Sequence, residues 1–168
     1  ALLIVALVLH AYSAFKLWSR AQGARSDRYV VKKAVAASLS SKMMRWGGVT
    51  LLLFLIFHLI QFTIAKVNFN GSHTAADLKV DGAESPFRLV VSSFQLWWVV
   101  LIYVLAVCAL GMHLRHGVWS ACQTLGWTNT AKSRRYANIL GYAVALIVAI
   151  GFALPPLAIL AGQIKMGA

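Results

Sequence analysis

Long apolar runs alternate with short polar segments along the whole chain. Four runs approach the length of about 20 residues that a helix needs to cross a bilayer. They extend over roughly residues 1–18, 46–65, 94–117 and 136–161. The pattern therefore predicts an all-α integral membrane helical bundle with four spans in a single transmembrane domain.

Two of these runs have distinctive ends. The third run is followed without a turn signal by Trp119 to Gln123, which predicts a helix projecting beyond the membrane. Pro155 and Pro156 stand near the end of the fourth run, and proline removes a backbone donor from a helix. We expect a kink or a break there.

The charges in the connections predict the orientation of the chain. The protein carries 16 Lys and Arg residues against 4 Asp and Glu residues. Basic residues dominate the connections after the first and third runs, whereas residues 66–93 carry both signs. Cytoplasmic loops have an excess of Lys and Arg, so the two basic connections are expected inside. Orientation alone explains these charges, and docking of an acidic cytoplasmic partner is the alternative. Their place at the ends of apolar runs favours lipid headgroups over a nucleic-acid partner.

His113 lies inside the third run, where an ionisable side chain is costly and suggests a function. Ala109 and Gly117 stand four residues before and after it, on the same face of a helix. These small neighbours leave room for a flat macrocycle against the backbone. The pattern indicates haem ligation by His113.

Two further histidines lie in the predicted spans. His10 is flanked by two alanines at the same spacing, so it repeats the pattern around His113. His58 is flanked by two phenylalanines instead. For His58 two interpretations are open: haem ligation, and a core histidine hydrogen-bonded with Gln61.

The expected orientation gives each histidine a depth. His10 lies shortly before Lys16, and His113 lies just before Arg115, so both fall in the inner half of the membrane. At about 1.5 Å per residue their depths differ by no more than a turn or two. His58 falls in the outer half, where the other spans have no histidine. We expect an inner haem held by His10 and His113, and an outer haem that His58 shares with a span missing from the N-terminus.

Three arginines are expected at the inner membrane surface, Arg20, Arg45 and Arg115. A guanidinium group pairs well with a carboxylate, so these side chains are candidates to hold the inner haem's propionates. The alternative is that each reaches lipid phosphate groups.

The stretch H-L-R-H-G-V-W-S-A, from His113 onward, resembles the H-x-x-x-G-x-W element of the cytochrome b membrane anchor in di-haem succinate:menaquinone oxidoreductases and related fumarate reductases. The resemblance covers most of the chain and implies five spans in the complete subunit, with ligand histidines on four successive helices. It implies the pairing of His10 with His113, and of His58 with a ligand on the missing helix. It favours His113 over His116, which remains a candidate for propionate or quinone contact.

A second element, beginning at Ser41 and containing Arg45, is similar to the S-x-x-x-R-x-[ST]-G element of membrane anchors in this superfamily, where it can line a quinone pocket. Gly47 replaces the hydroxyl residue of that element. A helix cap is therefore the preferred role for Ser41, with quinone contact as the alternative.

The resemblance implies a haem-b membrane anchor of succinate dehydrogenase in the bacterial cytoplasmic membrane. It would dock an iron–sulfur subunit and a flavoprotein subunit on the cytoplasmic side and pass electrons to menaquinone. The chain has no nucleotide motif or cysteine cluster, so we expect no dicarboxylate catalysis in it. Two alternatives are the anchor of another quinone-linked enzyme, of the nitrate reductase or hydrogenase type, and a haem-free transport or assembly protein.

Overall fold

The computed structural model describes residues 2–24 and 38–166, which fall into two compact units. The first unit contains helix α1 (Leu2–Gly23). The second contains all the other elements. Most of the first basic connection, residues 25–37, lies outside the described residues.

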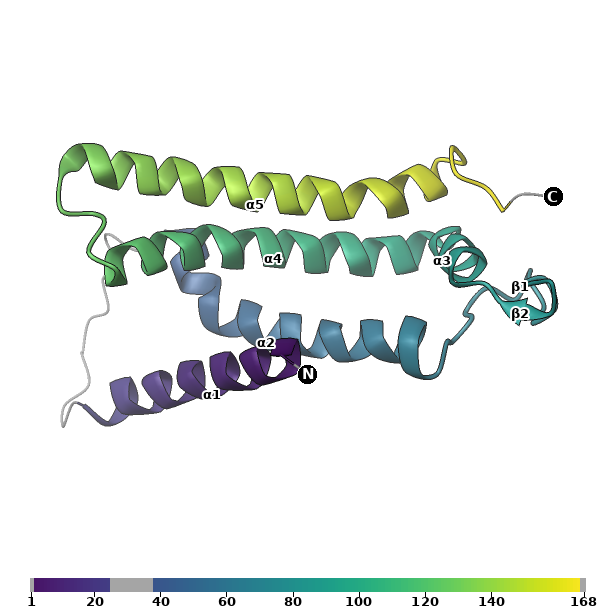
Figure 1. Ribbon diagram of the computed structural model, residues 1–168, viewed down its shortest axis with the longest axis horizontal. Helices are drawn as coiled ribbons and strands as arrows, with labels where there is room; N and C mark the ends of the chain where they lie inside the picture. Colours follow the sequence, from purple (N-terminus) through teal and green to yellow (C-terminus); the bar gives the residue numbers. More distant parts are fainter. Residues whose placement is uncertain (1, 25–37, 167–168) are drawn as a thin grey trace. The chain divides into compact units, whose positions relative to one another are not determined.

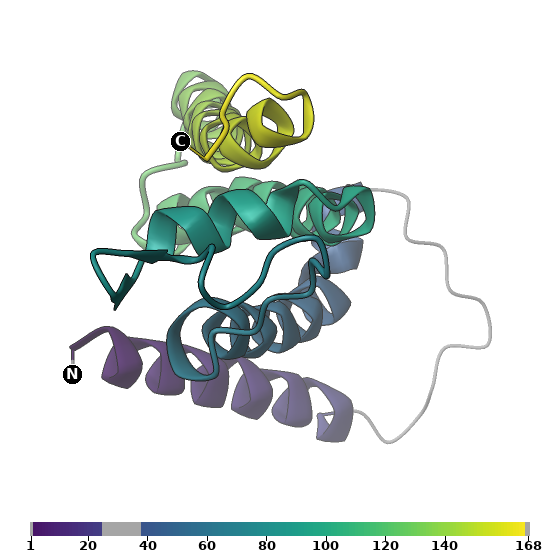
Figure 2. The ribbon, with the colours of Figure 1, turned by 90° about the vertical axis from the view of Figure 1, so that its right-hand side faces the viewer.

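The second unit is built around one central helix. Helix α2 (Leu39–Leu59) continues into a π-helical turn, η1 (Ile60–Ile64). Helix α4 (Trp97–Thr124) packs against α2 on one side and against α5 (Ala131–Leu160) on the other (Figures 1 and 2). Among the described residues, four helices are long and apolar enough to cross a membrane: α1, α2 with η1, α4 and α5. The predicted all-α membrane bundle is confirmed.

Helices α4 and α5 approach closely because small residues lie at their contact. A Cβ atom added to Gly141 of α5 would lie 2.8 Å from the carbonyl oxygen of Arg115 on α4. A Cβ added to Gly111 would lie 3.4 Å from that of Ala149. Small residues of this kind let helix backbones meet in membranes, where van der Waals packing is a main source of association.

The helix boundaries extend beyond the predicted spans because capping groups set them. Helix α2 starts seven residues before the predicted position 46, since the Ser38 side chain accepts a hydrogen bond from the backbone N–H of Ser41 at 3.2 Å. Ser38, and not Ser41, is thus the cap residue. Helix α4 continues to Thr124, as predicted.

Helix α5 begins at Ala131, five residues before the predicted position 136, after a capping box between Thr130 and Ser133. It runs through Pro155 and Pro156 to Leu160. The expected break at the two prolines is therefore absent, and the helix continues for one further turn.

A short hairpin follows η1 in the connection that was expected outside. Strands β1 (Lys79–Val80) and β2 (Ala83–Glu84) pair antiparallel across Asp81-Gly82, where both residues have positive φ, 51° and 77°. Two-residue hairpin turns favour this dipeptide for that reason. Lys66 forms an ion pair with Glu84 and holds the pKa of that carboxyl below its usual range.

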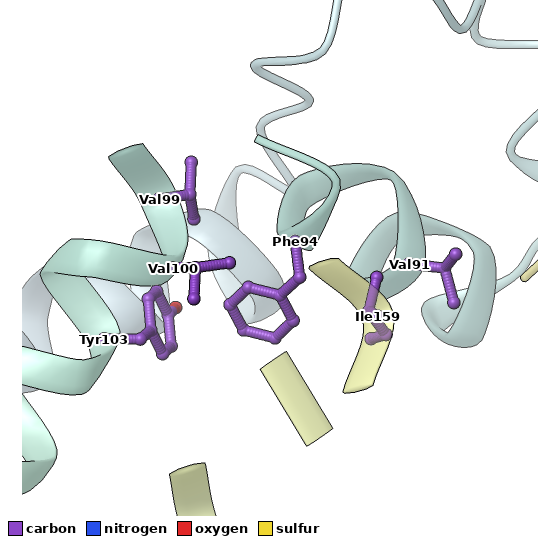
Figure 3. Close-up of a cluster of buried hydrophobic side chains, with 6 residues drawn as sticks. All are labelled: Val91, Phe94, Val99, Val100, Tyr103 and Ile159. Carbon is purple, nitrogen blue, oxygen red and sulfur yellow. The ribbon is translucent and has the colours of Figure 1, made fainter. Parts of the chain in front are cut away.

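Helix α3 (Pro86–Phe94) leads from the hairpin to α4 and starts with Ser85 as cap and proline in its first turn. It was not predicted, although cap and proline together are a known start signal. A buried cluster joins α3, α4 and α5 (Figure 3). Its members are Val91, Phe94, Val99, Val100, Tyr103 and Ile159.

Candidate functional site

His58 lies at the end of α2 and forms a hydrogen bond with α4. Its Nδ1 is 3.2 Å from the hydroxyl oxygen of Tyr103. That hydroxyl donates to Oε1 of Gln61 at 3.0 Å. His58 and Gln61 are three residues apart, so both reach the same side of their helix. The link to Gln61 that the sequence suggested therefore runs through Tyr103.

Aromatic side chains surround this chain of hydrogen bonds. The rings of Phe54 and Phe62 lie one turn to either side, with centroids 6.1 Å and 5.5 Å from that of His58. Tyr103 is only 7% exposed, and Gln61 1%. In such apolar surroundings hydrogen bonds are strong, and an unmade one is costly.

The arrangement of His58 fits an axial haem ligand. A ligating histidine binds metal through one ring nitrogen and usually donates the other N–H to an acceptor. The Tyr103 hydroxyl has one proton and gives it to Gln61, so it accepts from Nδ1 of His58. The proton is then on Nδ1 and the lone pair on Nε2, which makes no hydrogen bond to the residues described. A packed core histidine would make the same bond, and ligation by His58 stays a prediction.

His113 lies on α4 opposite Gly48 of α2. A Cβ added to Gly48 would be 3.6 Å from Cε1 of His113. At Gly47, which is buried, and at Gly117, an added Cβ would meet nothing within 4 Å. Binding of a flat group beside His113 stays a prediction.

His58 and His113 lie at different depths in the second unit. On α2, Gly48 lies against His113 and is ten residues before His58. On α4, Tyr103 lies against His58 and is ten residues before His113. Ten residues of helix correspond to about 15 Å. The two histidines therefore cannot ligate the same iron atom. This agrees with the separate depths expected from the sequence.

His10 and Arg20 lie on α1, which is a compact unit of its own. Both side chains are exposed within it. The pairing of His10 with His113, and the role of Arg20 beside a haem, stay predictions.

Arg115 joins three helices near the end of the second unit where α2 begins. Its Nη1 donates to the hydroxyl oxygens of Ser38 at 3.1 Å and Ser40 at 2.6 Å. Its Nη2 donates to Asn138 at 3.4 Å, and the guanidinium carbon is 4.7 Å from the ring centroid of Tyr142. Arg115 thus fastens α2 and α5 to α4, and its contact with a haem propionate stays a prediction.

The remaining predicted residues lie near this end of the second unit. The Ser41 hydroxyl donates to the carbonyl oxygen of Ser38 at 2.8 Å, and Arg45 is exposed on α2. Contact of Ser41 with a quinone and contact of Arg45 with a haem stay predictions. His116 lies half-buried on α4.

Sequence reasoning missed Tyr103 and did not see how it connects His58 with Gln61. A signal was present, because a tyrosine hydroxyl and an amide inside apolar runs both need a hydrogen-bond partner. Ser38 and Ser40 were likewise not identified as the partners of Arg115. Sequence alone gives the need for a partner and not its position.

The family described as succinate dehydrogenase/fumarate reductase transmembrane subunit matches residues 19–152, most of the chain. The chain belongs to this family. No curated protein and no solved structure matches it. As a transmembrane subunit of succinate dehydrogenase or fumarate reductase, the protein is a multi-pass membrane component of a complex with other subunits. The resemblance stated from the sequence is confirmed at this level.

Membership of this family sets aside the anchors of nitrate reductase and hydrogenase, and transport or assembly proteins, while the haem content stays a prediction. The matched residues of the transmembrane subunit include His58, Tyr103, His113 and Arg115. His10 precedes them.

Proposed function

We propose that this transmembrane subunit is the haem-b anchor of a succinate:menaquinone oxidoreductase, holding two haem b groups with pairs of histidines. In this role it carries electrons between the iron–sulfur subunit and menaquinone. The observation that supports the proposal most is the pair of intramembrane histidines, His58 and His113. They are about 15 Å apart along the helices, and each fits an axial ligand.

The residues of the chain take defined roles in this proposal. His113 and His10 are the ligands of the inner haem, and Gly117, one turn after His113, carries no side chain that would oppose a flat group there. His58 is a ligand of the outer haem. Haem b supplies a one-electron carrier whose potential depends on the axial ligands, on burial and on nearby charge.

The arginines Arg20, Arg45 and Arg115 are proposed to neutralise the propionate groups of the inner haem. A guanidinium group can bind a carboxylate through two parallel hydrogen bonds, which favours arginine over lysine in this role. Ser41 is a weaker candidate for contact with the quinone.

Charge supports docking of the iron–sulfur and flavoprotein subunits on the cytoplasmic side. Exposed basic residues lie at the starts of α2 and α5: Lys42, Arg45, Lys132, Arg134 and Arg135. The acidic residues that the structure describes all lie in the connection between η1 and α3, which begins at the other end of α2. This asymmetry fits the bacterial cytoplasmic membrane, with the basic end inside.

The proposal is tested by quantifying haem b in the purified complex from reduced-minus-oxidised spectra. We expect two haems per subunit in the wild type. His113→Ala and His10→Ala should each lose the same inner haem, and His58→Ala should lose the outer one. His73→Ala is the matched control, since His73 lies in the outer connection and bonds with Gln95. Unchanged haem content in His113→Ala would contradict the proposal.

A further inference from the structure

We propose that Tyr103 and Gln61 are positioning residues for His58: they hold its imidazole proton on Nδ1 and thereby present Nε2 as the iron ligand. The inference rests on the proposed function, because it requires that His58 binds haem. Neither residue would touch the iron. Both would act through the imidazole ring.

The direction of the hydrogen bonds follows from Gln61. Its Oε1 can only accept, and it lies 3.0 Å from the Tyr103 hydroxyl. The hydroxyl has a single proton, so a hydroxyl that donates to Gln61 must accept from His58. The amide oxygen of Gln61 therefore selects the tautomer of a histidine that it does not contact.

Packing holds the ring of Tyr103, and with it the hydroxyl oxygen, in place. The ring makes edge-to-face contacts with Phe54 at 4.9 Å and Phe94 at 4.8 Å between centroids. It belongs to the buried cluster that joins α3, α4 and α5 (Figure 3). The packing of the cluster thus fixes the acceptor for Nδ1 in place.

Gln61 lies in the π-helical turn that directly follows α2. In this turn the N–H of Ala65 bonds to the carbonyl oxygen of Ile60, five residues earlier, at 3.0 Å. Such turns are rare in proteins, and those that occur are often found at functional sites. The Nε2 of Gln61 is buried and makes no hydrogen bond with any residue the structure describes. The bond from Tyr103 to Oε1 is thus the hydrogen bond that the structure describes for this side chain.

The bond should also lower the potential of the outer haem. An imidazole that donates its Nδ1 proton to an acceptor is a more basic ligand through Nε2. A more basic ligand favours the oxidised iron. Loss of the acceptor should therefore raise the potential of the haem held by His58 and leave the inner haem unchanged.

The first variant is Tyr103→Phe in the purified complex, which removes the hydroxyl and keeps the aromatic ring. Redox titration of the haem spectra should show an upward shift for the outer haem alone. The matched control is Tyr136→Phe on α5, because Tyr136 is 60% exposed. It should shift neither haem.

The second variant is Gln61→Leu, which takes away the acceptor of the Tyr103 proton. The hydroxyl is then free to donate to Nδ1, and the histidine proton moves to Nε2, where it opposes ligation. We expect a lower occupancy of the outer haem. Adding Tyr103→Phe should restore it to the level of Tyr103→Phe alone, because the competing donor is gone. Such non-additivity is the sign of residues acting in one network.

The outcomes separate the inference from the proposed function. If His58→Ala loses a haem and Tyr103→Phe leaves the potential of that haem unchanged, the positioning role is wrong and the haem anchor stands. If His58→Ala keeps the full haem content, ligation by His58 is wrong, and the inference fails with it.

Discussion

Two polar residues of α4, Tyr103 and Arg115, form hydrogen bonds with other helices of the second unit. Tyr103 links α4 to the end of α2, and Arg115 links α4 to the start of α2 and to α5. In an apolar environment a polar side chain without a partner is costly, so these bonds select one arrangement of the helices over others.

We predict that Arg115→Ala lowers the free energy of unfolding of the purified subunit by about 1–3 kcal/mol, the usual range for a hydrogen bond to a charged group. The variant removes the guanidinium group that donates to the side chains of Ser38, Ser40 and Asn138. Denaturant titration in detergent, compared at equal haem content, measures the change.

Arg135→Ala is the control for this prediction. Arg135 is exposed on α5 and has the same charge, so its removal should change the free energy of unfolding little. Equal stability of the two variants would show that Arg115 does not hold the helices together.

At the scale of whole helices, the backbones of α4 and α5 approach closely where Gly141 meets Arg115. The carbonyl oxygen of Arg115 occupies the space where a side chain at position 141 would begin. Backbone atoms cannot move away as a flexible side chain can. The contact should therefore tolerate no larger residue at Gly141.

We predict that Gly141→Ala destabilises the bundle by about 1–3 kcal/mol, as expected when atoms are inserted into a packed contact. Gly151→Ala on the same helix is the matched control, because its added Cβ would meet nothing within 4 Å. Unfolding in detergent compares them. A Gly141→Ala variant as stable as the control would contradict the close approach.

At the scale of the whole protein, polar segments that differ in charge lie at the two ends of the second unit. The hairpin and α3 follow the end of α2, whereas the turn between α4 and α5 lies at the other end (Figure 1). Acidic residues occur in the first segment and basic residues flank the second. The charge difference predicts which end faces the cytoplasm.

We predict that a cysteine at Ala76 reacts with a membrane-impermeant thiol reagent from outside the cell, and that one at Asn129 reacts only after the membrane is opened. Both positions are exposed in the polar connections. Cys108 and Cys122 would first be replaced by alanine. Labelling of both positions from the same side would contradict the assigned topology.

The sequence by itself determined the four membrane helices, the histidines within them, the difference in charge between the connections, and the family resemblance. These features are local. The hydrocarbon region is a nearly uniform solvent, so the length and hydropathy of a single segment decide whether it can cross. The starts of α2 and α5 were placed too late, because Ser38 and Thr130 cap helices that begin in polar sequence, which hydropathy does not register.

The tertiary structure alone decided the partners of the polar groups. His58 and Tyr103 are 45 residues apart, and Arg115 and Ser40 are 75 residues apart. Which residues meet depends on the rotation and the register of two packed helices, and these are set by side-chain packing over the whole contact. Gly141 shows the same dependence. The sequence shows that this residue is small. Only the packing of α4 and α5 shows that the backbone of Arg115 lies against it.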